Sequence, residues 1–363
     1  MLLLRPALKL VLFLTATLIA LVGAEIVVRC VRDPRPLEVL EQRRVFPTYY
    51  PLAEADLFTR DHEERMRYRL TPGFEMELDG NSYRINDVGF RGAEEEVWDA
   101  PGVRRVVLLG DSYAFGLGVD QDATLSAQLE VRLENAGQQA AVLNLGVPGF
   151  HTGQELAMAE RVGFELDPEL VVLLYCGNDE VGEAFQYDPV DRVLYGDALP
   201  VPYALKGPLA RSAIYRWLAR IKVGRMRAKG EFSTFGSRHW AVTRERLETL
   251  FRACADRGIG LVLANLPILW SSEALCDPDW TGHENYERVA SLAEVNHVPW
   301  VDLRSVMLAE REFPEDPFLN RLLISLEPPR DHHLNAAGYS IVADAIAREI
   351  LEGGLLPEMS DPH

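Results

Sequence analysis

The feature of this sequence that most limits its fold is a series of short, largely apolar runs that alternate with stretches of helical spacing. The apolar runs lie at 105–109, 140–145, 170–175, 259–266 and 298–303, and the helical stretches lie at 123–136, 154–163, 244–257, 284–295 and 335–351. Strands that are apolar on both faces must be covered on both faces, and parallel strands are joined by crossover helices. The sequence therefore predicts an α/β fold, a three-layer α/β/α sandwich with a parallel sheet of about five strands, in which Asn335 is the N-cap of the last helix.

The amino-terminal segment has a different character. Residues 10–24 carry no charge, and Glu25 is the only acid in the apolar run that continues to residue 28. A bilayer core of ~30 Å needs roughly 20 helical residues, so this run is long enough to span one. We expect residues 1–36 to be a membrane anchor with a transmembrane helix, or a signal segment cleaved near Val22-Gly23-Ala24. A buried core helix is the third interpretation.

Basic residues flank this segment unequally. Two precede the run and five follow it, namely Arg5 and Lys9 before it and Arg29, Arg32, Arg35, Arg43 and Arg44 after it. Positive charge favours the cytoplasmic side of a membrane, so this rule alone would place the large carboxyl-terminal part inside the cell.

The chain as a whole is acidic, with 55 Asp and Glu against 37 Lys and Arg and a formal net charge of −18. A general nucleic-acid binder needs a basic surface, so nucleic acid is not an expected partner. The four cysteines show neither a CxxC pair nor zinc spacing, and we predict no metal site and no cofactor. Residues 211–229 nevertheless hold seven basic residues and no acid. This stretch is typical of a helix at a membrane surface, of an entry for an anionic substrate, or of a solvated helix face.

Turn residues separate the amino-terminal segment from the first apolar run. Pro47, Pro51, Pro72-Gly73 and Asp79-Gly80 predict that residues 37–100 are an irregular lead-in segment. The α/β domain is then expected at 101–355, with an insertion at about 185–240. Residues 86–92, Asn-Asp-Val-Gly-Phe-Arg-Gly, indicate a turn that leads into the sheet with Phe90 as an anchor; a role in substrate binding is the alternative.

Four short segments stand where predicted strands end or the last helix begins. They are Gly110-Asp111-Ser112-Tyr113, Asn144 to Gly149, Gly177-Asn178-Asp179, and Asp331-His332-His333-Leu334-Asn335. Sites in parallel sheets lie beyond the carboxyl ends of the strands, so these segments are expected to meet at one edge. Each alone is typical of a turn, but the four together, in this order, resemble the SGNH/GDSL hydrolase superfamily.

The resemblance covers about residues 103–351, except the insertion, and it implies a flavodoxin-like SGNH fold and a set of site residues. It makes Ser112 the nucleophile, which needs a base to take its proton. The implied oxyanion hole consists of the Ser112 backbone N–H, the Gly149 N–H and the Asn178 side chain, with Gly146 as the alternative glycine.

The base and the carboxylate require a choice. His333, followed by Leu334-Asn335, matches the histidine of the family, and His332 is the alternative base. The family's usual spacing is Asp-x-x-His, but Arg330 stands three positions before His333, so Asp331 is the expected carboxylate in an Asp-x-His pattern. The string Asp-His-His could also indicate a metal site, but the aspartate motifs that would accompany it are absent from the amino-terminal part.

The resemblance implies an SGNH/GDSL-type serine hydrolase, a serine esterase or an O-acyltransferase that forms an acyl-enzyme. The Gly-Phe-Arg-Gly stretch is similar to one in the membrane-anchored branch, which makes ester (acetyl) groups of cell-envelope carbohydrate the expected substrate. The implied partners are an ester-bearing polysaccharide and the membrane, and the implied location is single-pass membrane with an extracytoplasmic catalytic domain, against the positive-inside preference. The alternative function is a catalytically inactive glycan-binding or scaffolding module of an envelope assembly.

Overall fold

The computed structural model describes residues 4–32, 57–61, 65–66, 68–78, 80–92, 98–177, 179, 201–202, 205, 209, 211–229, 237–267, 269, 271–277, 282–313, 315–325 and 331–356. The chain divides into two compact units. One comprises Met1–Thr48 and Glu183–Ser233, and the other comprises Tyr49–Gly182 and Thr234–His363. The domain boundaries expected from the sequence stay a prediction, and each unit is described by itself.

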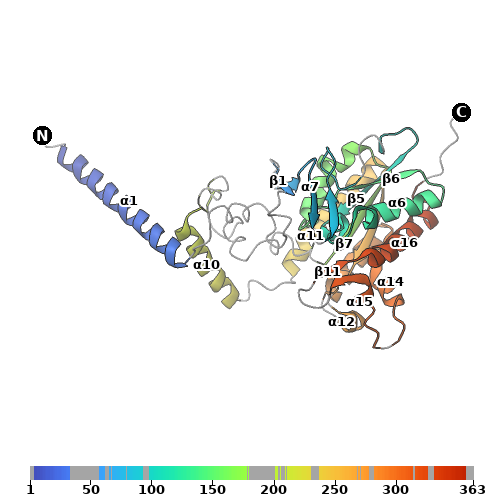
Figure 1. Ribbon diagram of the computed structural model, residues 1–363. Helices are drawn as coiled ribbons and strands as arrows, with labels where there is room; N and C mark the ends of the chain where they lie inside the picture. The colour runs from blue at the N-terminus through green and yellow to red at the C-terminus, as the bar shows by residue number, and fades with distance from the viewer. Residues whose placement is uncertain are drawn as a thin grey trace. The chain divides into compact units, whose positions relative to one another are not determined.

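The larger unit is built on a parallel sheet of five strands (Figure 1). Its strands are β5 (Arg104–Gly110), β6 (Ala140–Asn144), β7 (Leu170–Cys176), β8 (Gly260–Leu266) and β9 (Trp300–Asp302), in the spatial order β6-β5-β7-β8-β9. Every strand corresponds to one of the apolar runs, which confirms the predicted sheet. The order changes direction between β5 and β7, and such switch points are where open α/β sheets bind ligands.

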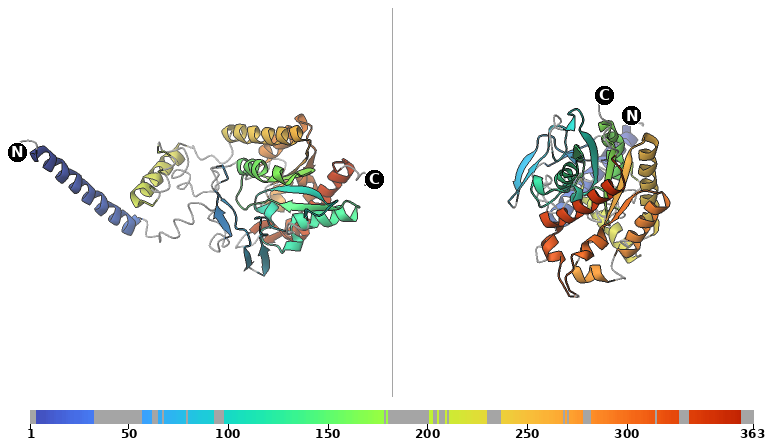
Figure 2. Two further views of the ribbon diagram at one scale, coloured as in Figure 1. Left: turned by 90° about the horizontal axis from the view of Figure 1, so that it is seen from above. Right: turned by 90° about the vertical axis from the view of Figure 1, so that its right-hand side faces the viewer.

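Helices cover both faces of this sheet (Figure 2). Helices α6 (Leu125–Asn135), α14 (Leu303–Ala309) and α16 (Ala336–Glu352) pack on one face, and α7 (Thr152–Arg161), α11 (Ser237–Arg257) and α13 (His283–Val295) pack on the other. Side chains alternate along each strand, so Val106 and Leu108 of β5 join the core with α6 and α16, while Val107 lies beside the segment that follows α7. Asn335 caps α16 by accepting hydrogen bonds from the backbone N–H groups of Ala337 and Gly338, as predicted.

Several short elements connect these layers. They are α5 (Ser112–Phe115), the 3₁₀ turns η1 (Gln121–Ala123) and η2 (Gly163–Leu166), α12 (Ser272–Cys276), α15 (Leu319–Leu322), and the antiparallel strands β10 (Leu323–Ser325) and β11 (Asp331–Leu334). The pair of β10 and β11 lies outside the main sheet and supplies the segment that carries both histidines.

The lead-in segment is more regular than predicted. It holds two antiparallel pairs, β1 (Phe58–Arg60) with β2 (Tyr68–Leu70), and β3 (Glu75–Leu78) with β4 (Asn81–Arg84). In the second pair Leu78 opposes Asn81, so two residues link the strands, and the second of them, Gly80, has a φ of 82° that suits glycine. The prediction of an irregular segment was wrong here because these strands are only three or four residues long and largely polar, which hides their alternation.

The smaller unit contains α1 (Leu4–Arg32) and α10 (Ala213–Ala228). In the described part of the chain, α1 is the one helix long and apolar enough to cross a membrane, over Val11–Val31 with a mean hydropathy of 2.4. A membrane anchor and a signal segment both have these properties. The third interpretation, a core helix, is wrong because none of that span is buried.

Candidate active site

Ser112 lies at the carboxyl end of β5, in the first position of the short helix α5. Asp111 stabilises this helix start, because its Oδ1 accepts a hydrogen bond of 2.9 Å from the backbone N–H of Tyr113. Only 3% of Ser112 is exposed. The strand, the cap and the burial together hold the hydroxyl at the switch point of the sheet.

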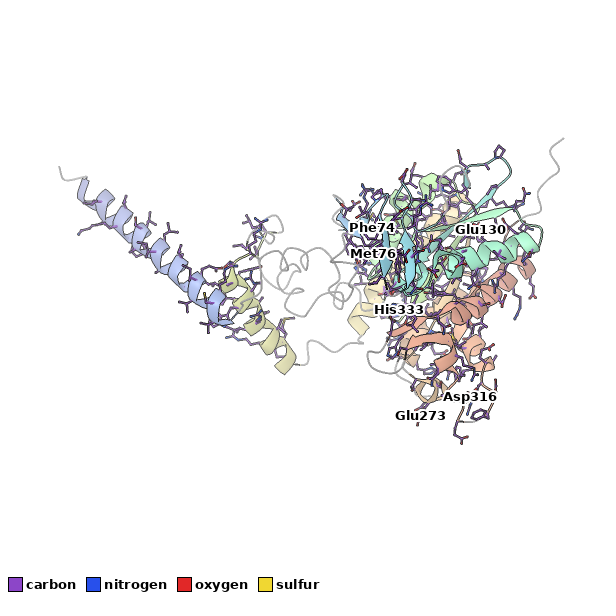
Figure 3. All side chains as sticks on the ribbon, in the orientation of Figure 1. Phe74, Met76, Glu130, Glu273, Asp316 and His333 are labelled. Atoms are coloured by element: carbon purple, nitrogen blue, oxygen red, sulfur yellow. The ribbon has the colours of Figure 1, made fainter. Side chains whose placement is uncertain are left out.

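Strand β11 brings a histidine and a carboxylate to this serine. His333 Nε2 lies 2.8 Å from Ser112 Oγ, and His333 Nδ1 lies 2.6 Å from Asp331 Oδ1. The same Asp331 oxygen accepts the backbone N–H of His333 at 3.0 Å. Residues two apart on a strand point to the same side, so the Asp-x-His spacing places both side chains on one face of β11. Figure 3 labels His333 at this strand.

The electrostatics of the carboxylate favour its charged form. Partial burial opposes ionisation of Asp331, but the hydrogen bonds and charge of His333, with a smaller contribution from His332, outweigh burial and lower the pKa of Asp331 below its ordinary value. An ionised Asp331 can accept an Nδ1–H of His333, and in that tautomer of the neutral imidazole Nε2 faces the serine hydroxyl as an acceptor.

The neighbouring histidine faces elsewhere. His332 Nδ1 contacts the backbone carbonyl of Leu269, and the backbone carbonyl of His332 accepts a hydrogen bond of 3.1 Å from the Tyr113 hydroxyl. The Tyr113 ring also packs against His333, with 4.8 Å between ring centroids. Of the two histidines, His333 is therefore the one that the structure brings to Ser112.

Two of the three expected oxyanion donors lie among the described residues. Among the described residues, neither the Ser112 N–H nor the Gly149 N–H has an acceptor. The Gly146 N–H is already bonded to Asn144 Oδ1 at 3.0 Å. A Cβ on Gly146 would lie 2.4 Å from the Phe115 backbone nitrogen, so this glycine permits close packing against α5. Asn178 lies outside the described residues.

A search of the described residues for three or more His, Cys, Asp or Glu side chains able to hold a metal ion finds no such group. His333 contacts both Asp331 and Ser112, in the arrangement of an oriented base beside a hydroxyl.

Arg91, in the segment at 86–92, is a residue whose position the sequence did not reveal. The segment does form a turn with a buried Phe90, as expected, but Arg91 is fully buried. Its guanidinium donates to the backbone carbonyls of Gly116 at 2.5 Å, Val119 at 2.6 Å, Phe115 at 3.2 Å and Ser82 at 3.1 Å.

Aromatic rings complete the surroundings of this arginine. Its guanidinium carbon lies 4.5 Å from the Tyr83 ring centroid and 4.9 Å from that of Phe115. Burial lowers the pKa of Arg91 to about 10, so it keeps its charge at neutral pH. Arg91 therefore ties the lead-in segment to the carboxyl end of α5, the helix that begins with Ser112.

Two further acids lie buried near the site. Burial and the negative charge of Asp111 raise the pKa of Glu155 on α7 well above its ordinary value. Burial, Glu155 and Asp111 do the same to Asp179, against a hydrogen bond of 2.7 Å from the Cys176 N–H. In the described part of the chain, both side-chain oxygens of Glu155 lack a hydrogen-bond partner. Glu155 is thus held in an environment that favours its neutral form.

The fold and the contacts of Ser112, His333 and Asp331 are typical of a serine hydrolase. Residues 108–341 match the model of the GDSL-like lipase/acylhydrolase family. This match spans more than half of the chain, and the protein belongs to that family.

Several solved structures are distantly similar to this chain. A lipase/acylhydrolase from Enterococcus faecalis is 18% identical, with a TM-score of 0.44, over 71% of this chain and 100% of the other. The acetyl xylan esterase AlAXEase is 16% identical, with a TM-score of 0.40, over 67% and 97% of the two chains. A variant of an acetyl xylan esterase from Geobacillus stearothermophilus is 16% identical, with a TM-score of 0.41, over 71% and 97%. A search of curated proteins gave no match. These likenesses are distant, and the family assignment rests on the family model.

The contacts of Arg91 predict a large effect of its removal. Arg91→Met should lower the free energy of unfolding by about 2–5 kcal/mol, because it leaves several buried carbonyls without a donor. Arg84→Met is the matched control, since Arg84 pairs with Glu75 on the surface, and it should cost less than about 1 kcal/mol. Urea unfolding of both variants measures the difference. Equal losses would contradict the role of Arg91 as a tie to α5.

The buried acids predict a pH dependence of stability. Because the pKa of Glu155 is raised in the folded state, its stabilising contribution is present below the pKa of the unfolded chain and is lost as the pH rises through the folded-state pKa. Glu155→Gln removes this titration, so its Tm relative to the parent protein should be higher at about pH 9 than at about pH 5. Glu165→Gln, at an exposed glutamate, is the control. A Tm difference for Glu155→Gln that does not change with pH would refute the assignment.

Proposed function

We propose that this protein is a serine esterase or O-acyltransferase whose reaction passes through an acyl-enzyme on Ser112. The observation that carries the proposal is the hydrogen-bonded series from Asp331 through His333 to Ser112, with distances of 2.6 and 2.8 Å. In this proposal Ser112 is the nucleophile, His333 is the base and then the acid, and Asp331 orients the imidazole.

The first half of the reaction forms the acyl-enzyme. Ser112 Oγ attacks the ester carbonyl carbon while His333 Nε2 accepts the hydroxyl proton, and a tetrahedral intermediate with a negative oxygen results. The N–H groups of Ser112 and Gly149, together with the Asn178 side chain, are the proposed donors to that oxygen. The intermediate collapses, the bond to the alcohol breaks, and His333 gives its proton to the departing oxygen. The imidazolium is stabilised throughout by ionised Asp331.

The second half decides between the two activities. A water molecule, deprotonated by His333, attacks the acyl carbon and releases a carboxylic acid in an esterase, whereas a sugar hydroxyl takes the acyl group in an O-acyltransferase. Ester (acetyl) groups of cell-envelope carbohydrate are the proposed substrate, on the ground of the resemblance to the anchored branch. The anchor is proposed to be α1, retained rather than cleaved, with the catalytic domain outside the cytoplasm.

The proposed roles predict the effects of three substitutions. Ser112→Ala should abolish labelling by a fluorophosphonate probe, and His333→Ala should lower kcat for p-nitrophenyl acetate by about 10⁴-fold. His332→Ala is the matched control, because its ring contacts Leu269 instead of Ser112, and it should keep kcat within about tenfold of the parent protein. A folded parent protein that the probe does not label would support the inactive scaffolding module. Activity retained in His333→Ala and lost in His332→Ala would move the base to His332.

An acyl donor, p-nitrophenyl acetate, distinguishes esterase from transferase activity when it is supplied with and without an oligosaccharide acceptor. Acetyl groups recovered on the sugar identify a transferase, and acetate formed at the same rate with or without acceptor identifies an esterase. Ser112→Ala is the blank for both measurements, since either product requires the acyl-enzyme.

The proposed location predicts the behaviour of a reporter fused after residue 363. Alkaline phosphatase, which folds only outside the reducing cytoplasm, should be active in this fusion, and green fluorescent protein should be the weaker reporter. The residues after the apolar run favour the opposite side by the positive-inside rule. An inactive phosphatase fusion beside a fluorescent protein fusion would place the catalytic domain in the cytoplasm.

A further inference from the structure

Glu25, the one acid in the apolar run of α1, holds the beginning of α10. Its carboxylate accepts hydrogen bonds from the backbone N–H groups of Ala213 at 2.6 Å and Ile214 at 3.1 Å, and from the Ser212 hydroxyl at 2.8 Å. Arg29, one turn further along α1, pairs with the same carboxylate at 2.9 Å. The first N–H groups of a helix have no partner within the helix and favour a negative charge. Glu25 therefore attaches α10 to the carboxyl-terminal part of α1.

The side chains of α10 divide into two faces. The buried face repeats at intervals of three or four residues, and its members are Ala213, Arg216, Ala219 and Val223. Trp217, at the edge of this face, is 40% exposed, and Leu218, on the other side of the helix, is 48% exposed. Lys222 and Arg225 lie four and seven positions after Leu218 and so share its side of the helix. The outward face of α10 thus joins exposed apolar side chains to basic ones.

This combination matches the interface of a bilayer. Trp is enriched at the level of the lipid headgroups, and basic amphipathic helices lie in that layer with apolar side chains toward the acyl chains. Each Lys or Arg near an anionic surface strengthens binding to it. The stretch at 211–229 has seven basic residues and no acid in a chain of net charge −18. This stretch therefore attracts anions, whereas the net charge of the whole chain repels them.

The attachment point gives α10 its place along α1. Glu25 precedes Arg32, the last residue of α1, by seven positions, which is about 10 Å at the rise of an α-helix. The candidate span ends at Val31. Glu25 thus lies six residues, about 9 Å, before the end of the span and directly after its uncharged run of residues 10–24. When α1 crosses a bilayer, the beginning of α10 is therefore held in the outer part of the span, on the side of its carboxyl-terminal end.

We propose that α10 is an interfacial helix that binds anionic phospholipid headgroups, with Trp217 and Leu218 directed into the bilayer and Lys222 and Arg225 on the phosphates. The inference rests on the proposed retention of α1 as a membrane anchor. In this proposal Glu25 holds the beginning of α10 against the membrane-spanning part of α1. The proposal also assigns the outward face of α10 one partner, a negatively charged lipid surface.

An environment-sensitive fluorophore on single cysteines of the full chain tests this assignment. Cys30→Ser and Cys276→Ser remove the two cysteines that are not buried. The fluorophore NBD is then attached at Leu218→Cys, at Phe13→Cys in the apolar run of α1, or at Val131→Cys on α6, where the parent side chain is exposed. Each protein is reconstituted into nanodiscs of phosphatidylcholine alone or of phosphatidylcholine mixed with phosphatidylglycerol, and is compared with the protein in detergent.

We expect the fluorophore at residue 218 to shift to the blue and to gain intensity severalfold in the anionic nanodiscs, and less so with phosphatidylcholine alone. Lys222→Glu with Arg225→Glu, or added salt, should remove the difference between the two lipids. The control pair Arg252→Glu with Arg348→Glu reverses two exposed arginines outside α10 and should leave the difference intact. The fluorophore at residue 131 should respond to neither lipid.

Each other outcome has a distinct meaning. A blue-shifted label at residue 13 with no response at residue 218 keeps the anchor and refutes the lipid-binding face. A label at residue 13 without a blue shift refutes the anchor and, with it, this inference. An equal blue shift at residue 218 in detergent and in both lipids means that protein covers this face, which also refutes the proposal.

Discussion

The hydrogen bond between Ser112 and His333 joins residues 221 positions apart, and it exists only if both ends of the α/β domain are fixed. Strand β5 fixes the serine. The position of His333 depends on β11. This strand is held against β10, because the backbone N–H of Asn335 donates to the Leu322 carbonyl and its side chain donates to the Leu323 carbonyl. Gly338 lets α16 approach this turn, since a Cβ there would lie 2.3 Å from the Leu322 oxygen. The Tyr339 hydroxyl then donates to the Tyr113 carbonyl at 2.9 Å, and so α16 reaches α5 directly.

The unusual spacing of the carboxylate follows from the local backbone. In an extended strand, residues at positions i and i+2 lie on one face, so Asp-x-His in β11 aligns both side chains without a turn between them. A residue at i+3 of the same strand would point to the opposite face. The shorter spacing is therefore the one that a strand requires, and it brings the Asp331 carboxylate to 2.6 Å from the imidazole. Partial exposure of Asp331 does not prevent this contact from lowering its pKa.

The sequence predicted the parts of the fold whose signal is local. Each strand of the main sheet contains a short apolar run, and the Asn335 cap acts within three residues, so both were predicted correctly. The strands β3 and β4 escaped detection because Glu75 to Leu78 and Asn81 to Arg84 are short and mostly polar. Arg91 escaped for a different reason. Its partners include backbone carbonyls 24 to 28 positions further on. Every residue has a backbone carbonyl, so the sequence does not indicate which carbonyls the arginine contacts. Only the folded chain reveals that this turn arginine is buried.

Glu25, Glu155 and Asp331 lie partly or wholly out of water, and each is accommodated differently. Glu25 accepts hydrogen bonds from the start of α10 and pairs with Arg29. Glu155 has no such donor among the described residues, and burial drives its pKa upward instead. Asp331 is the intermediate case, because burial opposes its charge while His333 supplies both hydrogen bonds and attraction. Catalysis of the proposed kind needs a carboxylate that is charged and yet directed at a single imidazole. Of these three environments, that of Asp331 alone couples the charge to a group that also contacts a serine hydroxyl, and for this reason the carboxylate role is proposed for Asp331 and not for the more deeply buried Glu155.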